Sequence, residues 1–210
     1  MTIDGNELHL KINGFARDTG WLHPPATAYA KYGLVVFAAL LLVGWWIARP
    51  RPARIMAAAP LAPVSTLLAV AVNQPIIRHV AESRPYLLHP SALVLVSKTA
   101  DPSFPSDHAA MAGAVAVGLL LVSWPLGLVA TGCALAMAFD RVYVGAHYPQ
   151  DVLAGLAVGA GVALLVWLLL RIPVTRLVER LRATRLRSLL VSTDGPAPSS
   201  GRRLEDPART

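Results

Sequence analysis

Charged side chains are scarce in this chain of 210 residues, since Asp, Glu, Lys and Arg together make up only 15% of it. Soluble domains carry about a quarter of their residues as charged groups. Hydrophobic residues account for 55% of the chain, more than a single soluble domain of this length can bury in its core. The composition therefore excludes an ordinary soluble domain and predicts an all-α membrane protein.

Cysteine and acidic residues are also few. Cys133 is the only cysteine, which excludes a disulfide within the chain. The 12 acidic residues are outnumbered by 19 basic ones, giving a net charge of +7. The arginines gather beside apolar segments rather than on a face rich in aromatic residues, so we expect a membrane and no nucleic acid as the partner. Neither a cofactor nor an oligomeric state is indicated.

What the chain does contain is long runs without charge, at residues 32–48, 55–77, 109–139 and 152–170. About 20 apolar residues in a helix cross a bilayer core of about 30 Å. The run 109–139 has 31 residues and would be ~46 Å long as one helix. Pro125 disfavours helix at Trp124, so we predict two short spans hinged at 123–125. The expected fold is a polytopic bundle of about five transmembrane helices.

The remaining segments predict a simple domain organisation. Residues 1–30 form an N-terminal interfacial segment with an amphipathic helix at 2–20, and residues 31–171 form the transmembrane domain. The second span is expected to unwind near Asn73, because Gln74 and Pro75 follow it. Residues 172–191 read as a basic amphipathic helix on anionic lipid or, equally, as a solvated cytoplasmic extension. Residues 192–210 are expected to be disordered.

Two polar stretches flank the predicted hairpin, at 104–108 and 141–151. His147 has Asp151 four residues on, and a carboxylate within reach fixes the tautomer of an imidazole that acts as nucleophile or base. Arg141 offers a fork of donors shaped for phosphate oxygens. His108 follows Pro-Ser, where a helix could begin with free N–H groups facing an anion. The pattern is typical of phosphate chemistry at a membrane surface.

Three motifs carry a family resemblance: Arg-Pro at 84–85, Pro-Ser-x-His at 105–108 and Arg-x5-His-x3-Asp at 141–151. In this order they resemble the signature of the type 2 phosphatidic acid phosphatase superfamily, which includes membrane lipid phosphatases and soluble vanadium haloperoxidases. The stretches 103–109 and 142–151 are most similar to the bacitracin-resistance type of undecaprenyl-diphosphate phosphatase. The three motifs together are a specific signal, whereas each alone is weak.

The resemblance implies a role for each site residue. His147 would attack phosphorus to form a phosphohistidine, Asp151 would orient its ring, and His108 would protonate the leaving oxygen. Phosphate-binding residues would be Arg84, Arg141, Arg78, Ser106 and Asp107, together with backbone N–H groups at 106–108. Such a site needs no metal. An open alternative is that His108, His147 and Asp151 ligate a divalent metal.

Some positions depart from the family pattern. The usual Lys of the first motif is replaced by Ile77, so Arg78 is the nearest cation. Asp107 stands where Gly is commonest, although the bacitracin-resistance type also has Asp there, and it would tune His108 or bind the distal part of a diphosphate. Asp140 replaces the usual Ser before Arg141. The other histidines, His9, His23, His79 and His89, are interpreted as polar residues at an interface.

Function and orientation follow as expectations. The positive-inside rule places the arginines at 49–54 and after 170 in the cytoplasm, with all three motifs on the outer face of the plasma membrane. The resemblance implies hydrolysis of a polyprenyl, undecaprenyl-type diphosphate to the monophosphate and phosphate. One alternative substrate is phosphatidic acid or another lipid phosphate. An alternative of another class is a non-enzymatic membrane scaffold or transporter.

Overall fold

The computed structural model describes residues 5–184, and in this part of the chain all regular structure is helical. The helices are α1 (Gly5–Asp18), α2 (His23–Ala48), α3 (Ala53–Val80), α4 (Pro85–Leu88), α5 (Asp107–Val122), α6 (Trp124–Tyr143) and α7 (Pro149–Arg182), with one 3₁₀ turn, η1 (Gly20–Leu22). The predicted all-α class is confirmed. The tail predicted at 192–210 lies outside the described residues.

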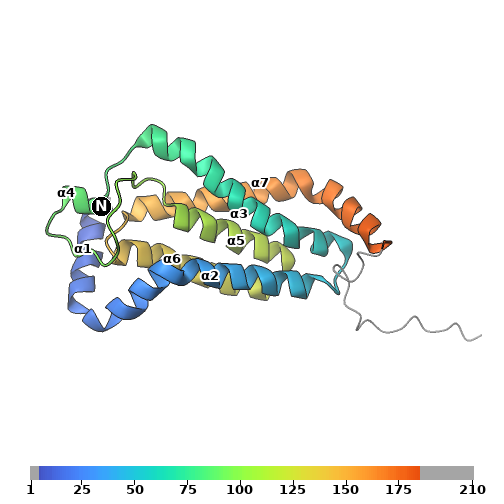
Figure 1. Cartoon of the computed structure of the whole chain (residues 1–210), viewed down its shortest axis with the longest axis horizontal. Coiled ribbons are helices and arrows are strands. Elements are labelled where there is room, and N and C mark those ends of the chain that lie inside the picture. The colour runs from blue at the N-terminus through green and yellow to red at the C-terminus, as the bar shows by residue number, and fades with distance from the viewer. Residues whose placement is uncertain (1–4, 185–210) are drawn as a thin grey trace, which may run out of the picture.

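Five helices run side by side along the bundle, with α5 packed against α3, α6 and α7 (Figure 1). Four segments of the described chain are long and apolar enough to cross a membrane: Gly20–Ala48, Ala53–Leu88, Trp124–Tyr143 and Pro149–Arg182. The fifth, α5, has 16 residues and is ~24 Å long at 1.5 Å per residue. It is the most enclosed helix, because small buried residues such as Ala110 and Ala114 line it.

The hinge predicted at 123–125 is confirmed. Helix α5 ends at Val122, Ser123 is extended, and α6 starts at Trp124 with Pro125 in its first turn. Proline suits this place because its missing N–H would have no partner in the helix there. The two arms return side by side, so the start of α5 and the end of α6 lie at the same end of the bundle (Figure 1).

Glycines bring α5 and α7 into backbone contact. A Cβ atom on Gly159 would lie 1.9 Å from the carbonyl oxygen of Ala110, and one on Gly155 would lie 2.4 Å from the carbonyl oxygen of Ser106. These distances leave no room for a methyl group. The first turn of α5 is therefore fixed against the first turns of α7, which begins two residues after His147 and carries Asp151.

The predicted unwinding of the second span near Asn73 is wrong. Helix α3 is continuous from Ala53 to Val80, with Pro75 inside it, and ends where Ala81 adopts the left-handed conformation. The polar side chains that suggested a break have partners elsewhere: Asn73 donates to the carbonyl oxygen of Pro105 at 3.1 Å and to Asp107 at 2.8 Å. They connect α3 to the start of α5.

The described part of the basic segment at 172–191 continues α7 rather than starting a new helix. Helix α7 passes through Pro173 to Arg182, and Val178 is buried against Met56 and its neighbours at the start of α3. Arg182 also donates to the carbonyl oxygen of Arg51 at 2.7 Å. The two arginine-rich segments therefore meet at one end of the bundle, while α1 and α4 lie at the other (Figure 1).

Candidate active site

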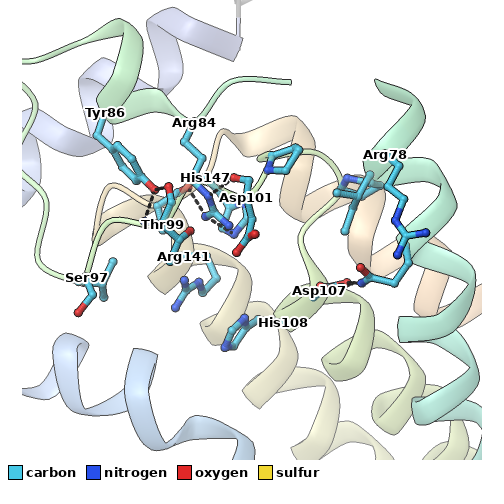
Figure 2. A pocket seen from close by; sticks show the side chains of 16 residues that line it. Arg78, Arg84, Tyr86, Ser97, Thr99, Asp101, Asp107, His108, Arg141 and His147 are labelled. Atoms are coloured by element: carbon cyan, nitrogen blue, oxygen red, sulfur yellow. Dashed lines mark hydrogen bonds between the residues drawn. The ribbon is translucent and has the colours of Figure 1, made fainter. Parts of the chain in front are cut away.

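A polar pocket of about 570 Å³ opens at the end of the bundle where α1 and α4 lie. It is lined by the end of α3, the segment 84–105, the start of α5, the end of α6 and the turn before α7 (Figure 2). Six of the eight predicted site residues line it: Arg78, Arg84, Asp107, His108, Arg141 and His147. Ser106 and Asp151 do not line the pocket, and both are fully buried.

The hydrogen bonds of His147 define its tautomer. Its Nδ1 lies 2.9 Å from the carbonyl oxygen of Ser103, and a carbonyl oxygen can only accept. Nδ1 therefore carries the proton, and the lone pair is on Nε2. Nε2 accepts from Nη1 of Arg84 at 3.3 Å, on the side of the pocket. The nitrogen that carries the lone pair is thus the one that a substrate in the pocket would meet.

Asp151 stabilises His147 on the Nδ1 side of its ring. Its Oδ2 lies 3.5 Å from Nδ1 of His147, which is too long for a strong hydrogen bond. The same oxygen accepts from the main-chain N–H of Tyr148 at 2.8 Å and from the hydroxyl of Ser103. Ser103 therefore connects the carboxylate to the ring, because its hydroxyl also lies 3.4 Å from Nδ1.

Burial and charge keep His147 neutral. The side chain is almost completely buried, and this burial lowers the pKa of His147 below its usual 6.5. The positive charges of Arg141 and Arg84 lower it further, while the carboxylate of Asp151 opposes them. A neutral imidazole at pH 7 is the form that can act as a nucleophile.

Two arginines bring positive charge to the pocket in different ways. Arg84 is held in place, since its Nε donates to the carbonyl oxygen of Asp101 at 2.8 Å and its Nη1 to that of Ala146 at 3.1 Å. Arg141 is buried, and its one hydrogen bond to residues 5–184 is long, 3.5 Å from Nη1 to the carbonyl oxygen of Ala30. Most donors of Arg141 thus remain for an anion in the pocket.

The second histidine stands at the start of α5. His108 lines the same pocket as His147 (Figure 2) and makes no side-chain hydrogen bond to the residues that the structure describes. Neighbouring Ser106 is fully buried, and its hydroxyl likewise has no partner among residues 5–184. The main-chain N–H of Ser106 donates to the carbonyl oxygen of Asp151 at 3.0 Å. This N–H group was expected to bind phosphate, and it is not available for that role.

Asp107 and Arg78 lie on the side of the pocket formed by α3. The carboxylate of Asp107 accepts from Asn73 at 2.8 Å and from Gln74 at 3.1 and 3.2 Å. These bonds direct its charge toward α3. Arg78 is exposed on the last turns of α3, beside Asp107 and away from His147 (Figure 2). Arg78 can therefore reach only a group at this side of the pocket.

Sequence reasoning missed several residues that support the site. Ser103 bridges His147 and Asp151, and Asn73 with Gln74 holds Asp107. His9 was also missed. It is interpreted above as a polar residue at an interface, but it is completely buried under the turn before α7. The signal for Ser103 was present in the stretch 103–109, whereas nothing in the pattern of α1 distinguished His9.

A metal was the open alternative for this site. Among residues 5–184, no three His, Cys, Asp or Glu side chains lie close enough together to hold a metal ion. The pocket instead presents guanidinium groups and imidazoles, a donor set that suits an anion. The arrangement can bind a phosphate group, present a nucleophilic nitrogen to it and move a proton at a second imidazole.

The fold and the pocket together define an integral membrane protein of the phosphatase class, since long apolar helices support a site built for an anion. The particular family follows from the sequence match: the chain belongs to the PAP2 superfamily, whose family description matches residues 28–172. The resemblance inferred from the three motifs is thereby confirmed.

Three relatives illustrate the similarity. Undecaprenyl-diphosphatase BcrC of Bacillus subtilis is 30% identical over 156 residues, which cover 72% of this chain and 77% of that protein. A lipid A 1-phosphatase of Rhizobium johnstonii is 48% identical over 65 residues, covering 30% of this chain and 26% of that protein. The crystal structure of Aquifex aeolicus LpxE shares the fold, with a TM-score of 0.60 and 21% identity over 76% of this chain and 94% of that one.

Proposed function

We propose that this phosphatase hydrolyses a polyprenyl diphosphate of the undecaprenyl type to the monophosphate and phosphate. The observation that carries the proposal is the pocket itself, which brings His108, Arg141 and His147 together from two distant motifs. Similarity to BcrC over 72% of the chain supports a diphosphate as substrate. A pocket of about 570 Å³ has room for a diphosphate group, with the lipid tail remaining in the bilayer.

In the first step, Nε2 of His147 attacks the terminal phosphorus of the substrate. The N–P bond forms as the bond from phosphorus to the bridging oxygen breaks, and His108 gives a proton to that leaving oxygen. Arg84 and Arg141 stabilise the charge on the equatorial oxygens. Ser106 takes no direct part in this step, because it does not line the pocket. Nη1 of Arg84 donates to Nε2 of His147 at 3.3 Å. When the phosphate arrives, this N–H group donates to a phosphate oxygen instead, which leaves the lone pair of Nε2 available for the attack.

In the second step, water resolves the phosphohistidine. His108, now neutral, takes a proton from the water as the oxygen attacks phosphorus and the N–P bond breaks. Phosphate leaves, and His147 returns to its neutral form with the proton still on Nδ1. The contacts of Nδ1 with Ser103 and Asp151 stabilise the positive charge that develops on the ring in both steps.

The orientation of the protein is part of the proposal. The turn at 49–54 and the end of α7 carry clustered arginines and meet through the bond from Arg182 to Arg51, at the end of the bundle far from the pocket. The positive-inside rule favours the cytoplasm for that end. The pocket then opens at the outer face of the plasma membrane, where Arg78 would face the phosphate nearer the lipid.

The proposal is tested by phosphate release from a panel of lipids. The purified protein is expected to turn over undecaprenyl diphosphate with a higher kcat/KM than phosphatidic acid or a polyprenyl monophosphate. His147→Ala and His108→Ala are each expected to lower kcat by at least about 10³-fold, while the detergent-solubilised protein stays monodisperse. Near-normal turnover by His147→Ala would refute the assigned nucleophile.

A phosphatase for another lipid phosphate is the second candidate. It is favoured by the 48% identity to a lipid A 1-phosphatase, although that match covers only 65 residues. The same panel separates the two, because faster release from a lipid monophosphate would select this candidate. A scaffold or transporter would release no phosphate from any lipid in the panel.

A further inference from the structure

His9 is an unusual residue for the buried face of a surface helix. Its side chain is 0% exposed, and neither ring nitrogen has a hydrogen-bond partner among residues 5–184. Burying a polar group without a hydrogen-bond partner destabilises the fold. An apolar residue at this position would avoid that cost, so stability alone does not explain a histidine here.

The ring of His9 lies against the residue that holds the catalytic carboxylate. It meets Tyr148 edge to face, with the ring centres 5.3 Å apart, and stacks on His89 at 6.4 Å. Tyr148 precedes α7, and its main-chain N–H donates to Oδ2 of Asp151 at 2.8 Å. Tyr148 thus connects His9 to Asp151, and neither His9 nor Tyr148 lines the pocket.

Helix α1 is fixed to the same region on both sides of His9. Asn13 exchanges two hydrogen bonds with the main chain of Leu93, at 2.8 and 2.9 Å, and Asn6 pairs with His89 at 2.7 Å. Gly5 approaches Gln150 so closely that a Cβ atom would lie 2.1 Å from the side-chain oxygen. The helix is therefore held against the segment 89–93 and the start of α7, and its Ala16 packs with Val144 and Ala146 of the turn.

We propose that His9 is a positioning residue for phosphoryl transfer. Its uncharged ring, held between His89 and Tyr148, keeps Tyr148 in place, and Tyr148 in turn keeps Asp151 and His147 in the positions that the reaction needs. This inference rests on the proposed function of the site. It assigns α1 a part in catalysis, although no residue of α1 lines the pocket.

The surroundings of His9 make this role sensitive to pH. The charged or titratable groups that face it are His89 from the segment after α4, and Tyr148 and Asp151 from the turn and α7; Glu82 lines the neighbouring cavity. Burial lowers the pKa of His9, the nearby His89 lowers it further, and the carbonyl of His147 and the carboxylate of Asp151 partly oppose them. Protonation at acid pH would place a charge in this buried space and displace Tyr148.

Two neutral histidines are then required for activity, His147 and His9. Well below both pKa values, protonation of each of these two rings lowers kcat/KM tenfold per pH unit. His9→Leu keeps a buried side chain of similar size but cannot titrate, so the slope of its acid limb should be smaller than that of the wild type by about 1. His9→Ala removes the contact with Tyr148, and its kcat at pH 7.5 should fall about 10- to 100-fold with KM within about twofold.

The experiment measures phosphate release from undecaprenyl diphosphate between pH 4.5 and 8.5 for the wild type, both His9 variants and His79→Leu. The last is a matched control, because His79 is exposed on α3 and should keep both the wild-type kcat and slope. An unchanged slope in His9→Leu, or a wild-type kcat in His9→Ala, would overturn the role of His9. Failure of the wild type to release phosphate would instead overturn the proposed function.

Discussion

Ser103 shows how much of the site depends on a single hydroxyl. It donates to Oδ2 of Asp151 and lies 3.4 Å from Nδ1 of His147, in a place with no access to solvent. In Ser103→Ala the carboxylate keeps only the N–H of Tyr148 on that oxygen. Losing a hydrogen bond to a buried charge costs about 1–3 kcal/mol, so kcat is expected to fall roughly 5- to 150-fold.

The measurement is steady-state phosphate release, with KM determined beside kcat. Because Ser103 acts on His147 and does not line the pocket, the loss should appear in kcat and leave KM within about twofold. Ser91→Ala is the matched control, since Ser91 is exposed and only its carbonyl accepts a hydrogen bond, from Arg17. A raised KM with normal kcat would show that Ser103 acts on substrate binding instead.

The titration of His147 gives a second prediction at this scale. Protonation removes the lone pair of Nε2, so kcat/KM must fall as pH decreases through the pKa of His147. Burial and the charges of Arg141 and Arg84 place that pKa below 6.5. The acid limb of the profile is therefore expected below pH 6.5, and Arg84→Gln should shift it upward by removing one positive charge. An acid limb centred above pH 7 would contradict this environment.

Single residues also mark the limit of what the sequence could predict. His108, Arg141 and His147 were predictable because their chemistry is carried by residue type and spacing, and all three line the pocket. The roles of Ser103 and His9 were not predictable, because they come from long-range contacts, although Ser103 itself lies in the stretch 103–109 that carries the family resemblance. Ser103 is 48 residues from Asp151, and a histidine on one face of an amphipathic helix has no pattern of its own.

At the scale of elements, the contact between α5 and α7 decides where His108 stands. A methyl group on Gly159 would lie 1.9 Å from the carbonyl oxygen of Ala110, two residues after His108. Gly159→Ala must push the helices apart, because the atom in the way belongs to the main chain and cannot change rotamer as a side chain can. We expect a loss of about 2 kcal/mol or more in stability, and a kcat at least tenfold lower because His108 moves away from the leaving oxygen.

Gly161 provides a control in the same helix. A Cβ atom there meets nothing within 4 Å, so Gly161→Ala should keep full activity and leave stability unchanged or raise it by about 0.5–1 kcal/mol. Thermal unfolding in detergent and phosphate release would be measured for both variants. Equal behaviour of the two would mean that the close approach of α5 and α7 does not position the site.

The same scale explains why one prediction about the helices held and another failed. Pro125 lies in a run too long for a single span, and steric exclusion by proline is a local effect that the sequence shows directly. Asn73, Gln74 and Pro75 suggested a break in α3 on the same grounds, yet the helix continues to Val80. The difference is tertiary: the side-chain amides bond to Pro105 and Asp107, which no local pattern could show.

The whole molecule combines a site at one end with clustered arginines at the other. Arg51 and Arg182 are in contact at the far end, although 131 positions separate them in the chain. This arrangement is possible only if α5 and α6 return to the same end, which the hinge at Ser123 provides. Because five crossings are an odd number, the start of α2 and the end of α7 lie on opposite sides of the membrane.

Orientation can be tested with single cysteines, because Cys133 is the only one in the sequence. In a Cys133→Ala background, S91C is exposed in the segment after α4, at the same end of the bundle as the pocket, and R51C is exposed in the turn between α2 and α3. A thiol reagent that cannot cross membranes should label S91C in intact cells, but R51C only after the cells are permeabilised. The positive-inside rule requires this order, since nine arginines lie at 49, 51, 54, 171, 176, 180, 182, 185 and 187. The reverse order would place the pocket in the cytoplasm, where the enzyme would meet lipid carriers on the inner leaflet instead of those on the outer one.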